Sequence, residues 1–333
     1  MRGVLVAVSA ALVLAAPSAA AAPTIPVLWS IRDDGAQRTA VTTLPVDGLI
    51  LARAPTGRLA VDTGDGLVLE NSDGGDQTLV PETQSVQAAV FSPSGSSVLF
   101  SLGDYGSSPA SWVLAVAPAS GAGFRVVAVD AALGSWSHDG RTIVYPGRIV
   151  GDQATVLAVP AAGGTATLLA SGASFDTDDD STPELSPDGR SVAYVCGNTG
   201  GGTLCVTRGG TTRRYPHGGW QPLWSPNGRY LATQLFGNYN SGAGLVDTVK
   251  RTRSVIAMPQ DIGVEYQVLA WSPDSTRLLY ERQCDAGLFI PSPCRFDTWV
   301  RTIASRRDRR VSVDGVTWSL AEWRGRTITY VTG

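Results

Sequence analysis

Short stretches of alternating apolar and polar residues run along the chain and are separated by turn residues. Thr142–Tyr145 is one example, and the segments 98–102, 112–117 and 155–159 are similar. Alternation with a period of two is typical of β-strands that bury one face. Glycine and proline account for 38 and 20 of the 333 residues, and they recur too closely for helices of ordinary length. The pattern therefore predicts an all-β protein.

One phrase recurs in front of these strands: an apolar residue, a Ser-Pro-Asp-Gly-like turn and a short apolar strand. Clear copies begin at Val90, Trp136, Leu185, Trp224 and Trp271, and weaker copies begin at Ala54 and Glu322. In this turn proline presets φ, aspartate bonds nearby backbone, and the fourth position takes a positive φ. The fourth positions recur every 38 to 50 residues: Gly57, Gly95, Gly140, Gly189, Gly228, Ser275 and Gly325. That period, with strands between the turns, predicts a β-propeller with one four-stranded blade per repeat.

Seven turns predict seven blades, but the last repeat has only the strands 317–321 and 327–331. The segments 27–32 and 38–44 form a spare N-terminal hairpin around Asp34-Gly35. We expect this hairpin to complete the last blade, because two plus two strands leave no exposed edge. A six-bladed propeller is the alternative if one of the weaker copies is accidental.

The turn phrase resembles the TolB-type, or PD40, repeat of WD40-like β-propellers, and its copies cover nearly all of the chain after residue 22. The resemblance implies the propeller fold and does not by itself specify a function. The chain lacks room for TolB's N-terminal α/β domain and has seven repeats rather than six, so TolB's partnership with Pal is in doubt. Related serine peptidases have a hydrolase domain that this chain lacks, and it has no G-x-S-x-G motif. Related oligogalacturonate lyases hold a metal with several histidines, whereas this chain has only His138 and His217.

The first 22 residues have the pattern of a signal peptide: Arg2, the apolar run Val4–Ala16, and small residues up to Ala22. The apolar run is too short to span a bilayer, which needs about 20 residues. We expect residues 23–333 to form a single propeller domain without a transmembrane segment. This domain should be a bacterial monomer that is secreted or held in the periplasmic or cell-wall space. A net charge of −3 argues against nucleic acid as a partner.

The four cysteines form two close pairs, Cys196 with Cys205 and Cys284 with Cys294. In an exported chain such pairs predict two local disulfides. The spacing does not match a zinc site, and no histidine lies nearby to complete one.

The predicted loops after the second and fourth strands of each blade share one side of the propeller, which we call the loop face. These loops are the longest and carry candidate binding residues: Tyr105, His217, Trp220, Tyr239 and Phe289. The alternative is that the aromatic residues pack the loops on themselves. His138 replaces proline in its turn and is interpreted as structural.

An acidic stretch on the same face contains Asp176, Asp178, Asp179 and Asp180. The 1-3-5 spacing of Asp176, Asp178 and Asp180 leaves a calcium site open, although Ser181 and Pro187 depart from the EF-hand pattern. The other interpretation is a solvated acidic binding loop, and no other cofactor is expected.

The opposite side holds the turns after the first and third strands, and we call it the turn face. Its predicted turns and adjacent strands are rich in basic residues, namely Lys250, Arg251, Arg253, Arg301, Arg306, Arg307, Arg309 and Arg310. Such a face suits an anionic envelope polymer or lipid surface. The arginines could instead only solubilise short turns.

We therefore predict an envelope or extracellular binding scaffold whose partner is a protein or a glycan, and we assign no catalytic residue. The alternative is a polysaccharide lyase or hydrolase with its site in the central funnel of the loop face. Two histidines and no recognisable acid–base pair argue against it, although paired carboxylates could still serve.

Overall fold

The computed structural model describes most of the chain after residue 25. The described residues are 26–44, 46, 48–103, 112–131, 134–149, 153–173, 182–196, 202–216, 219–236, 241–259, 263–284, 296–312 and 319–332. This part consists of β-strands joined by turns, as predicted, and it contains no helix that could cross a membrane.

Four of the sheets are antiparallel, have four strands each and follow chain order. The first contains β3 (Leu49–Arg53), β4 (Leu59–Asp62), β5 (Leu67–Glu70) and β6 (Thr78–Leu79). The second contains β7 (Val86–Phe91), β8 (Ser97–Leu102), β9 (Val113–Pro118) and β10 (Arg125–Val129). The third contains β11 (Ser135–Trp136), β12 (Thr142–Ile149), β13 (Gln153–Pro160) and β14 (Thr167–Ser171). The fourth contains β15 (Glu184–Leu185), β16 (Ser191–Cys196), β17 (Thr203–Arg208) and β18 (Thr211–Tyr215).

The next eight strands are hydrogen-bonded into one sheet. Its first half contains β19 (Trp220–Trp224), β20 (Tyr230–Phe236), β21 (Ser241–Asp247) and β22 (Thr252–Ala257). Its second half contains β23 (Val264–Trp271), β24 (Arg277–Cys284), β25 (Asp297–Thr302) and β26 (Arg307–Ser312). A single parallel pair, Ser241 with Glu265, joins the two halves, which are otherwise separate antiparallel units.

The first and last strands of the described chain belong to the same sheet. Its order is β2 (Thr39–Thr43), β1 (Val27–Arg32), β28 (Thr327–Thr332) and β27 (Ser319–Arg324). β1 pairs with β28 without a register shift, from Val27 opposite Thr332 to Arg32 opposite Thr327. The pairing predicted between the N-terminal hairpin and the last two strands is therefore present.

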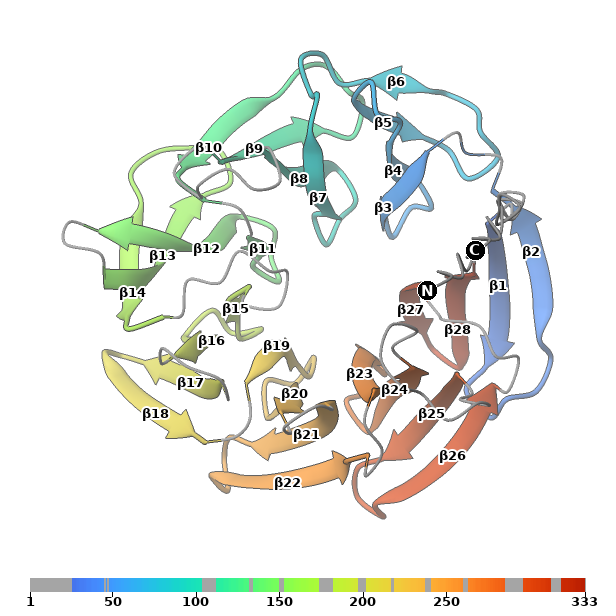
Figure 1. Cartoon of the computed structure of the whole chain (residues 1–333), viewed down its shortest axis with the longest axis vertical. Coiled ribbons are helices and arrows are strands. Elements are labelled where there is room, and N and C mark those ends of the chain that lie inside the picture. Colours follow the sequence, from blue (N-terminus) through green and yellow to red (C-terminus); the bar gives the residue numbers. More distant parts are fainter. Residues whose placement is uncertain are drawn as a thin grey trace, which may run out of the picture.

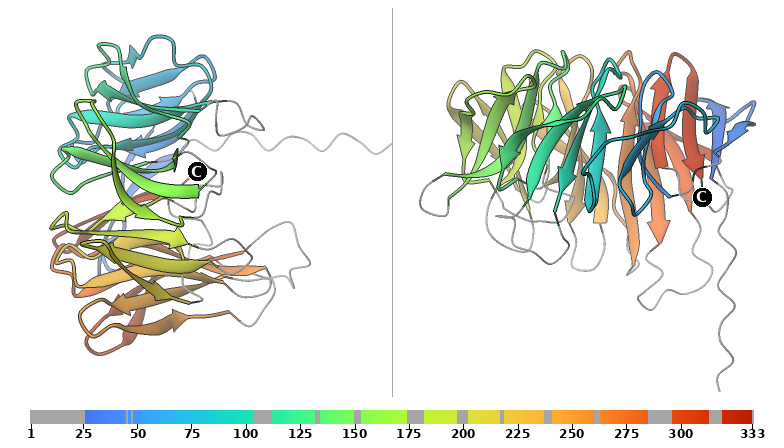
Figure 2. Two further views of the ribbon diagram at one scale, coloured as in Figure 1. Left: turned by 90° about the vertical axis from the view of Figure 1, so that its left-hand side faces the viewer. Right: turned by 90° about the horizontal axis from the view of Figure 1, so that it is seen from above.

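The sheets are arranged around a central axis, with one strand of each four-stranded sheet and one strand of each half-sheet innermost (Figure 1). The innermost strands are neighbours along the ring: β3 lies beside β7, β11 beside β15, β15 beside β19, β19 beside β23, and β23 beside β27. Seen from the side, the molecule is a flat disc with its strands running across the thickness (Figure 2). The two flat sides of the disc, where the strands end, correspond to the loop face and the turn face.

The recurring turn has the same hydrogen bonds in successive sheets. At the third sheet, Ser137 Oγ donates to Asp139 Oδ1, Arg141 N donates to the same oxygen, and Gly140 N donates to Ser137 O. Equivalent bonds are formed by Ser186 with Asp188, by Ser225 with Asn227 and by Ser272 with Asp274. The fourth turn residue has a positive φ in every copy, including Ser275 at 61°. The predicted turn chemistry is thus confirmed.

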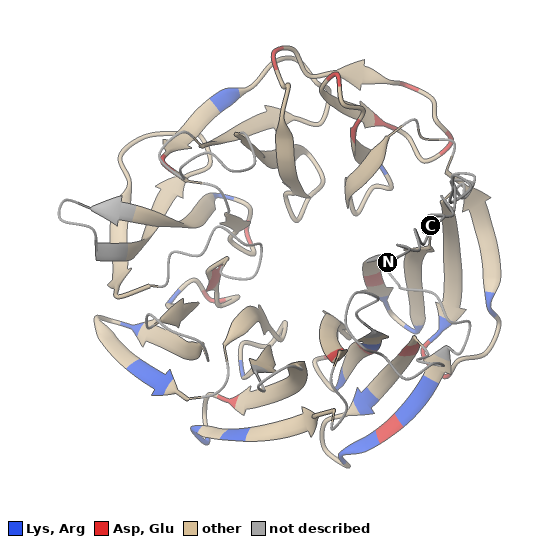
Figure 3. Ribbon diagram, in the orientation of Figure 1, with Lys and Arg blue, Asp and Glu red and all other residues tan. Residues whose placement is uncertain are grey.

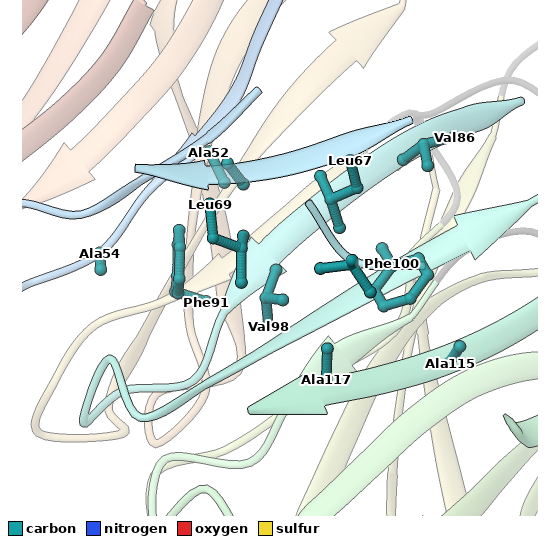
Figure 4. Packing of buried hydrophobic residues seen from close by; sticks show 12 residues of the cluster. Ala52, Ala54, Leu67, Leu69, Val86, Phe91, Val98, Phe100, Ala115 and Ala117 are labelled. Atoms are coloured by element: carbon teal, nitrogen blue, oxygen red, sulfur yellow. The ribbon is translucent and has the colours of Figure 1, made fainter. Parts of the chain in front are cut away.

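Apolar side chains fill the spaces between neighbouring sheets. Between the first and second sheets, Leu67 and Leu69 face Phe91, Val98 and Phe100 (Figure 4). Three tryptophans at the ends of inner strands also donate Nε1 across to the preceding sheet or half-sheet: Trp136 to Val90 O, Trp224 to Glu184 O and Trp271 to Leu223 O. The tryptophans therefore fix neighbouring inner strands relative to one another.

Candidate functional site

Most of the binding residues predicted on the loop face lie outside the described residues. These are Tyr105, Asp176, Asp178, Asp179, Asp180, His217, Tyr239 and Phe289. Trp220 is described: it begins β19, is half-buried, and packs its indole against Gly202 at the start of β17. The loop-face site and its calcium alternative therefore remain predictions. Across the described ranges, no three His, Cys, Asp or Glu side chains are grouped closely enough to hold a metal.

One of the two predicted disulfides falls within the described residues. Cys196 on β16 and Cys205 on β17 are paired, with their Cα atoms 5.8 Å apart. Both are buried between the third and fourth sheets. Cys294 of the second predicted pair lies outside the described residues, so that pair remains a prediction.

The turn face has a large groove between the fourth sheet and the β19–β22 half-sheet. The groove has a volume of about 730 Å³. Its walls come from two pairs of turns, 186–188 with 208–213 in the fourth sheet and 226–228 with 248–251 in the next. The sequence places all four on the same side of the ring, because a turn after a first strand and a turn after a third strand emerge at the same edge of a meander.

The floor of the groove is apolar and aromatic, whereas its rim is basic. Trp224 and Tyr215 are buried in the floor, and Arg208, Arg213 and Arg251 are exposed at the rim. Val249 adds an apolar contact surface, since it is 71% exposed. This combination fits a ligand that has anionic groups along an otherwise neutral body.

Two side chains of the groove, Tyr215 and Asp188, have a shifted pKa. Burial raises the pKa of Tyr215, against the opposing effect of the Arg213 and Arg251 charges. The hydrogen bond from Ser186 lowers the pKa of Asp188. Among the described residues, Asp188 is the one carboxylate that lines the groove. Its Oδ2 lies 3.8 Å from Arg208 NH2, and both side chains are largely exposed. Such an exposed pair is weak, so Arg208 is available to another anion.

A carboxyl group of the inner strand lies behind the groove. Glu184 Oε2 accepts a hydrogen bond from the backbone N–H of Trp224 at 2.8 Å. Burial raises the pKa of Glu184 to about 8, and the bond from Trp224 opposes the shift. Glu184 therefore joins β15 to β19 mainly in its neutral form at pH 7.

The basic turn face was predicted from the sequence, but this groove was not. Arg208, Arg213 and Arg214, which lie at the β17–β18 hairpin, were not among the predicted basic residues. A signal was available: Arg213-Arg214, Lys250–Arg253 and Arg306–Arg310 occupy the same place in three successive repeats, at or just before the fourth strand. Two residues of the floor, Tyr215 and Trp224, carried no such signal, because tryptophans recur at the Trp224 position for packing.

No family model matches the sequence, and a search of curated proteins finds no match. Among solved structures, a putative TolB from Agrobacterium tumefaciens is similar at a TM-score of 0.50 and 18% identity, covering 70% of this chain and 89% of that one. TolB from Acinetobacter baumannii is similar at a TM-score of 0.50 and 11% identity, and the match covers 93% of this chain and 64% of that one. An oligogalacturonate lyase in complex with manganese is similar at a TM-score of 0.57 and 14% identity, and the match covers 92% of this chain and 96% of that one. The neighbours are TolB and other β-propellers of the PD40 type, which confirms the predicted resemblance at the level of the fold.

Proposed function

We propose that this protein is a non-catalytic binding scaffold of the cell envelope or extracellular space, and that an anionic partner binds the groove between β15–β18 and β19–β22. The observation that carries the proposal is the basic rim of Arg208, Arg213 and Arg251 around an apolar floor. Guanidinium groups bind carboxylates and phosphates through paired hydrogen bonds, and a buried aromatic floor adds contact area.

The groove chemistry favours binding over turnover. General acid–base catalysis works best with a group that titrates near the working pH. Both groove groups with a shifted pKa move the other way, since the pKa of Tyr215 is raised and that of Asp188 is lowered. The groove is therefore suited to holding an anion rather than to moving a proton.

We further propose that residues 23–333 form one seven-bladed propeller that follows a cleaved signal peptide at residues 1–22. Support for seven blades comes from the eight-stranded sheet, whose halves each repeat the four-stranded order and share only the Ser241–Glu265 pair. The six-bladed alternative holds if one of the weaker turn copies, at Ala54 or Glu322, is accidental. Secretion into the envelope is supported by the apolar N-terminal run and by the close cysteine pairs.

The test is affinity capture from an envelope and secretome extract with the purified mature protein as bait. We expect an anionic partner that is retained by wild type and lost from an Arg213→Ser/Arg251→Ser variant. The matched control is Arg125→Ser/Arg141→Ser, which removes two exposed turn-face arginines outside the groove. A partner captured equally by all three proteins would contradict the assignment to the groove.

The alternative, a polysaccharide lyase or hydrolase acting in the loop-face funnel, shares its fold with the oligogalacturonate lyase neighbour. Product formation on a panel of glycans separates the two functions, because a scaffold releases no product. Turnover that survives Arg213→Ser/Arg251→Ser would favour the enzyme.

A further inference from the structure

We infer that the partner is a linear anionic polysaccharide that runs from the groove along the outer strands β18, β22 and β26. This inference rests on the proposed function, because the groove is one end of the track. It adds the class of ligand and a second contact region that the groove alone does not contain.

The three outer strands and the turns before them form a basic track along one arc of the ring (Figure 3). The track covers residues 208–216, 248–257 and 303–312, in which Asp308 is the one acidic residue. Its basic residues are Arg208, Arg213, Arg214, Lys250, Arg251, Arg253, Arg306, Arg307, Arg309 and Arg310. An excess of this size on one arc creates a local positive potential in a protein whose net charge is −3.

Few of these charges are neutralised by nearby carboxylates. Arg310 pairs with Asp297 at 2.6 Å, and Arg208 lies 3.8 Å from Asp188. Asp308 is engaged by Arg301 at 2.9 Å rather than by its neighbours in the track. Among the described residues, no carboxylate lies within ion-pair distance of the basic side chains at positions 213, 214, 250, 251, 306, 307 and 309.

The track is continuous from sheet to sheet. Arg253 NH1 on β22 donates to the backbone oxygen of Pro216, directly after β18, at 2.8 Å. Arg301 NH1 on β25 donates a hydrogen bond to the backbone oxygen of Ile256 on β22 at 3.4 Å. These bonds link successive sheets at the outer side of the ring, so the strands that carry the basic residues keep a fixed spacing. A rigid row of charges suits a ligand with a repeating charge.

Protection of sheet edges is the other explanation for basic outer strands, because charged side chains prevent edge-to-edge pairing. The rest of the ring argues against it. Outer strand β14 (Thr167–Ser171) and outer strand β2 (Thr39–Thr43) carry no charge, and β10 carries only Arg125. If charge were the means of edge protection here, these equally exposed edges would carry it too.

The layout favours a long polymer over a small anion or a peptide strand. A small anion needs only the groove, and a peptide that adds to one edge strand contacts one sheet. The basic residues lie on three successive outer strands, which a chain running around the rim crosses in turn (Figure 1). Hydroxyl side chains, including Thr211, Thr252 and Ser254, lie between the arginines and can bond the hydroxyl groups of sugars.

The experiment measures binding of the full mature protein to polygalacturonate, which has a carboxylate on each residue, and to phosphorylated dextran, which carries phosphate groups instead. Uncharged dextran and galacturonate monomer are the negative probes. We expect both polyanions to bind with affinity that falls steeply with salt, and the negative probes to bind weakly or not at all. The stronger of the two polyanions identifies the anionic group.

Variants separate this inference from the proposed function. Arg307→Ser/Arg309→Ser should weaken the long polymers by about ten-fold and leave short oligomers unaffected, because only long chains reach β26. Arg213→Ser/Arg251→Ser should weaken long and short chains alike, and Arg125→Ser/Arg141→Ser should change neither. If only the groove variant weakens binding, the proposed track is contradicted and the proposed groove site is supported. If neither variant weakens binding, both proposals are contradicted. Equal binding of poly-L-glutamate at matched charge would overturn the polysaccharide assignment in favour of an acidic peptide.

Discussion

Trp224 and Glu184 are joined by two hydrogen bonds across the boundary between β15 and β19. The Trp224 backbone N–H donates to Glu184 Oε2 at 2.8 Å, and Trp224 Nε1 donates to the Glu184 backbone oxygen at 3.1 Å. Trp224 also lies in the floor of the groove. The same tryptophan thus aligns the two inner strands and positions the floor of the proposed site.

The carboxyl group of Glu184 should make stability fall as pH rises. The unfolded chain loses this proton near the ordinary pKa of 4.5, whereas the folded protein keeps it to about 8. Between these values the folded state binds more protons, so the free energy of unfolding decreases with pH and levels off above about 8. Glu184→Gln should remove this contribution while keeping an acceptor for Trp224.

Urea unfolding at about pH 5 and about pH 8 checks this expectation. The Gln variant should match wild type at the lower pH and exceed it at the higher one. Exposed Glu82→Gln serves as the control for the loss of one carboxylate. An unchanged pH dependence in Glu184→Gln would show that Glu184 is already ionised in the folded protein at neutral pH.

Leu28 should be important for global stability although it lies near the start of the described chain. It is 4% exposed on β1 and packs with Leu44, Leu59, Val61 and Val331, which joins the terminal sheet to the first sheet. Leu28→Ala should lower the free energy of unfolding by about 2–4 kcal/mol. Val41→Ala on neighbouring β2, where the side chain is 55% exposed, should change it by less than about 0.5 kcal/mol. Similar losses in the two variants would argue against the packing role of β1.

The Cys196–Cys205 disulfide should contribute about 2–3 kcal/mol, because it closes a loop with a sequence separation of 9. The measurement is unfolding with and without reductant in a Cys284→Ser/Cys294→Ser background. Non-reducing peptide mapping of the wild-type protein tests both predicted pairs directly. A map that links a cysteine of one pair to a cysteine of the other would contradict the predicted connectivity.

Two turn glycines should differ in their tolerance of a side chain. Gly189 has φ +67°, and a Cβ at this position would meet nothing within 4 Å, so Gly189→Ala should cost about 1 kcal/mol from backbone conformation alone. Gly121 has φ +72°, and a Cβ there would collide with Thr78, so Gly121→Ala should cost more. Thermal unfolding of the two variants ranks them, and the reverse order would show that Thr78 can move aside.

The repeat was predictable because each copy carries its own local chemistry. Ser137, Asp139 and Gly140 specify a turn that needs no distant contact, and the pairing of β1 with β28 followed from counting strands. The groove was harder to predict because it arises between sheets. Arg213 and Arg251 are 38 positions apart in sequence, and only the rotation from one sheet to the next brings both to the same rim. Glu184 was missed for a similar reason, since its partner is a backbone amide of the adjacent inner strand.

The register of β1 against β28 also constrains when the protein can fold. Val27 pairs with Thr332, so the N-terminal hairpin cannot pair with β28 until about 300 further residues have been synthesised. Contacts between such distant positions form late and slowly. A newly made chain therefore stays incomplete until its final strand emerges.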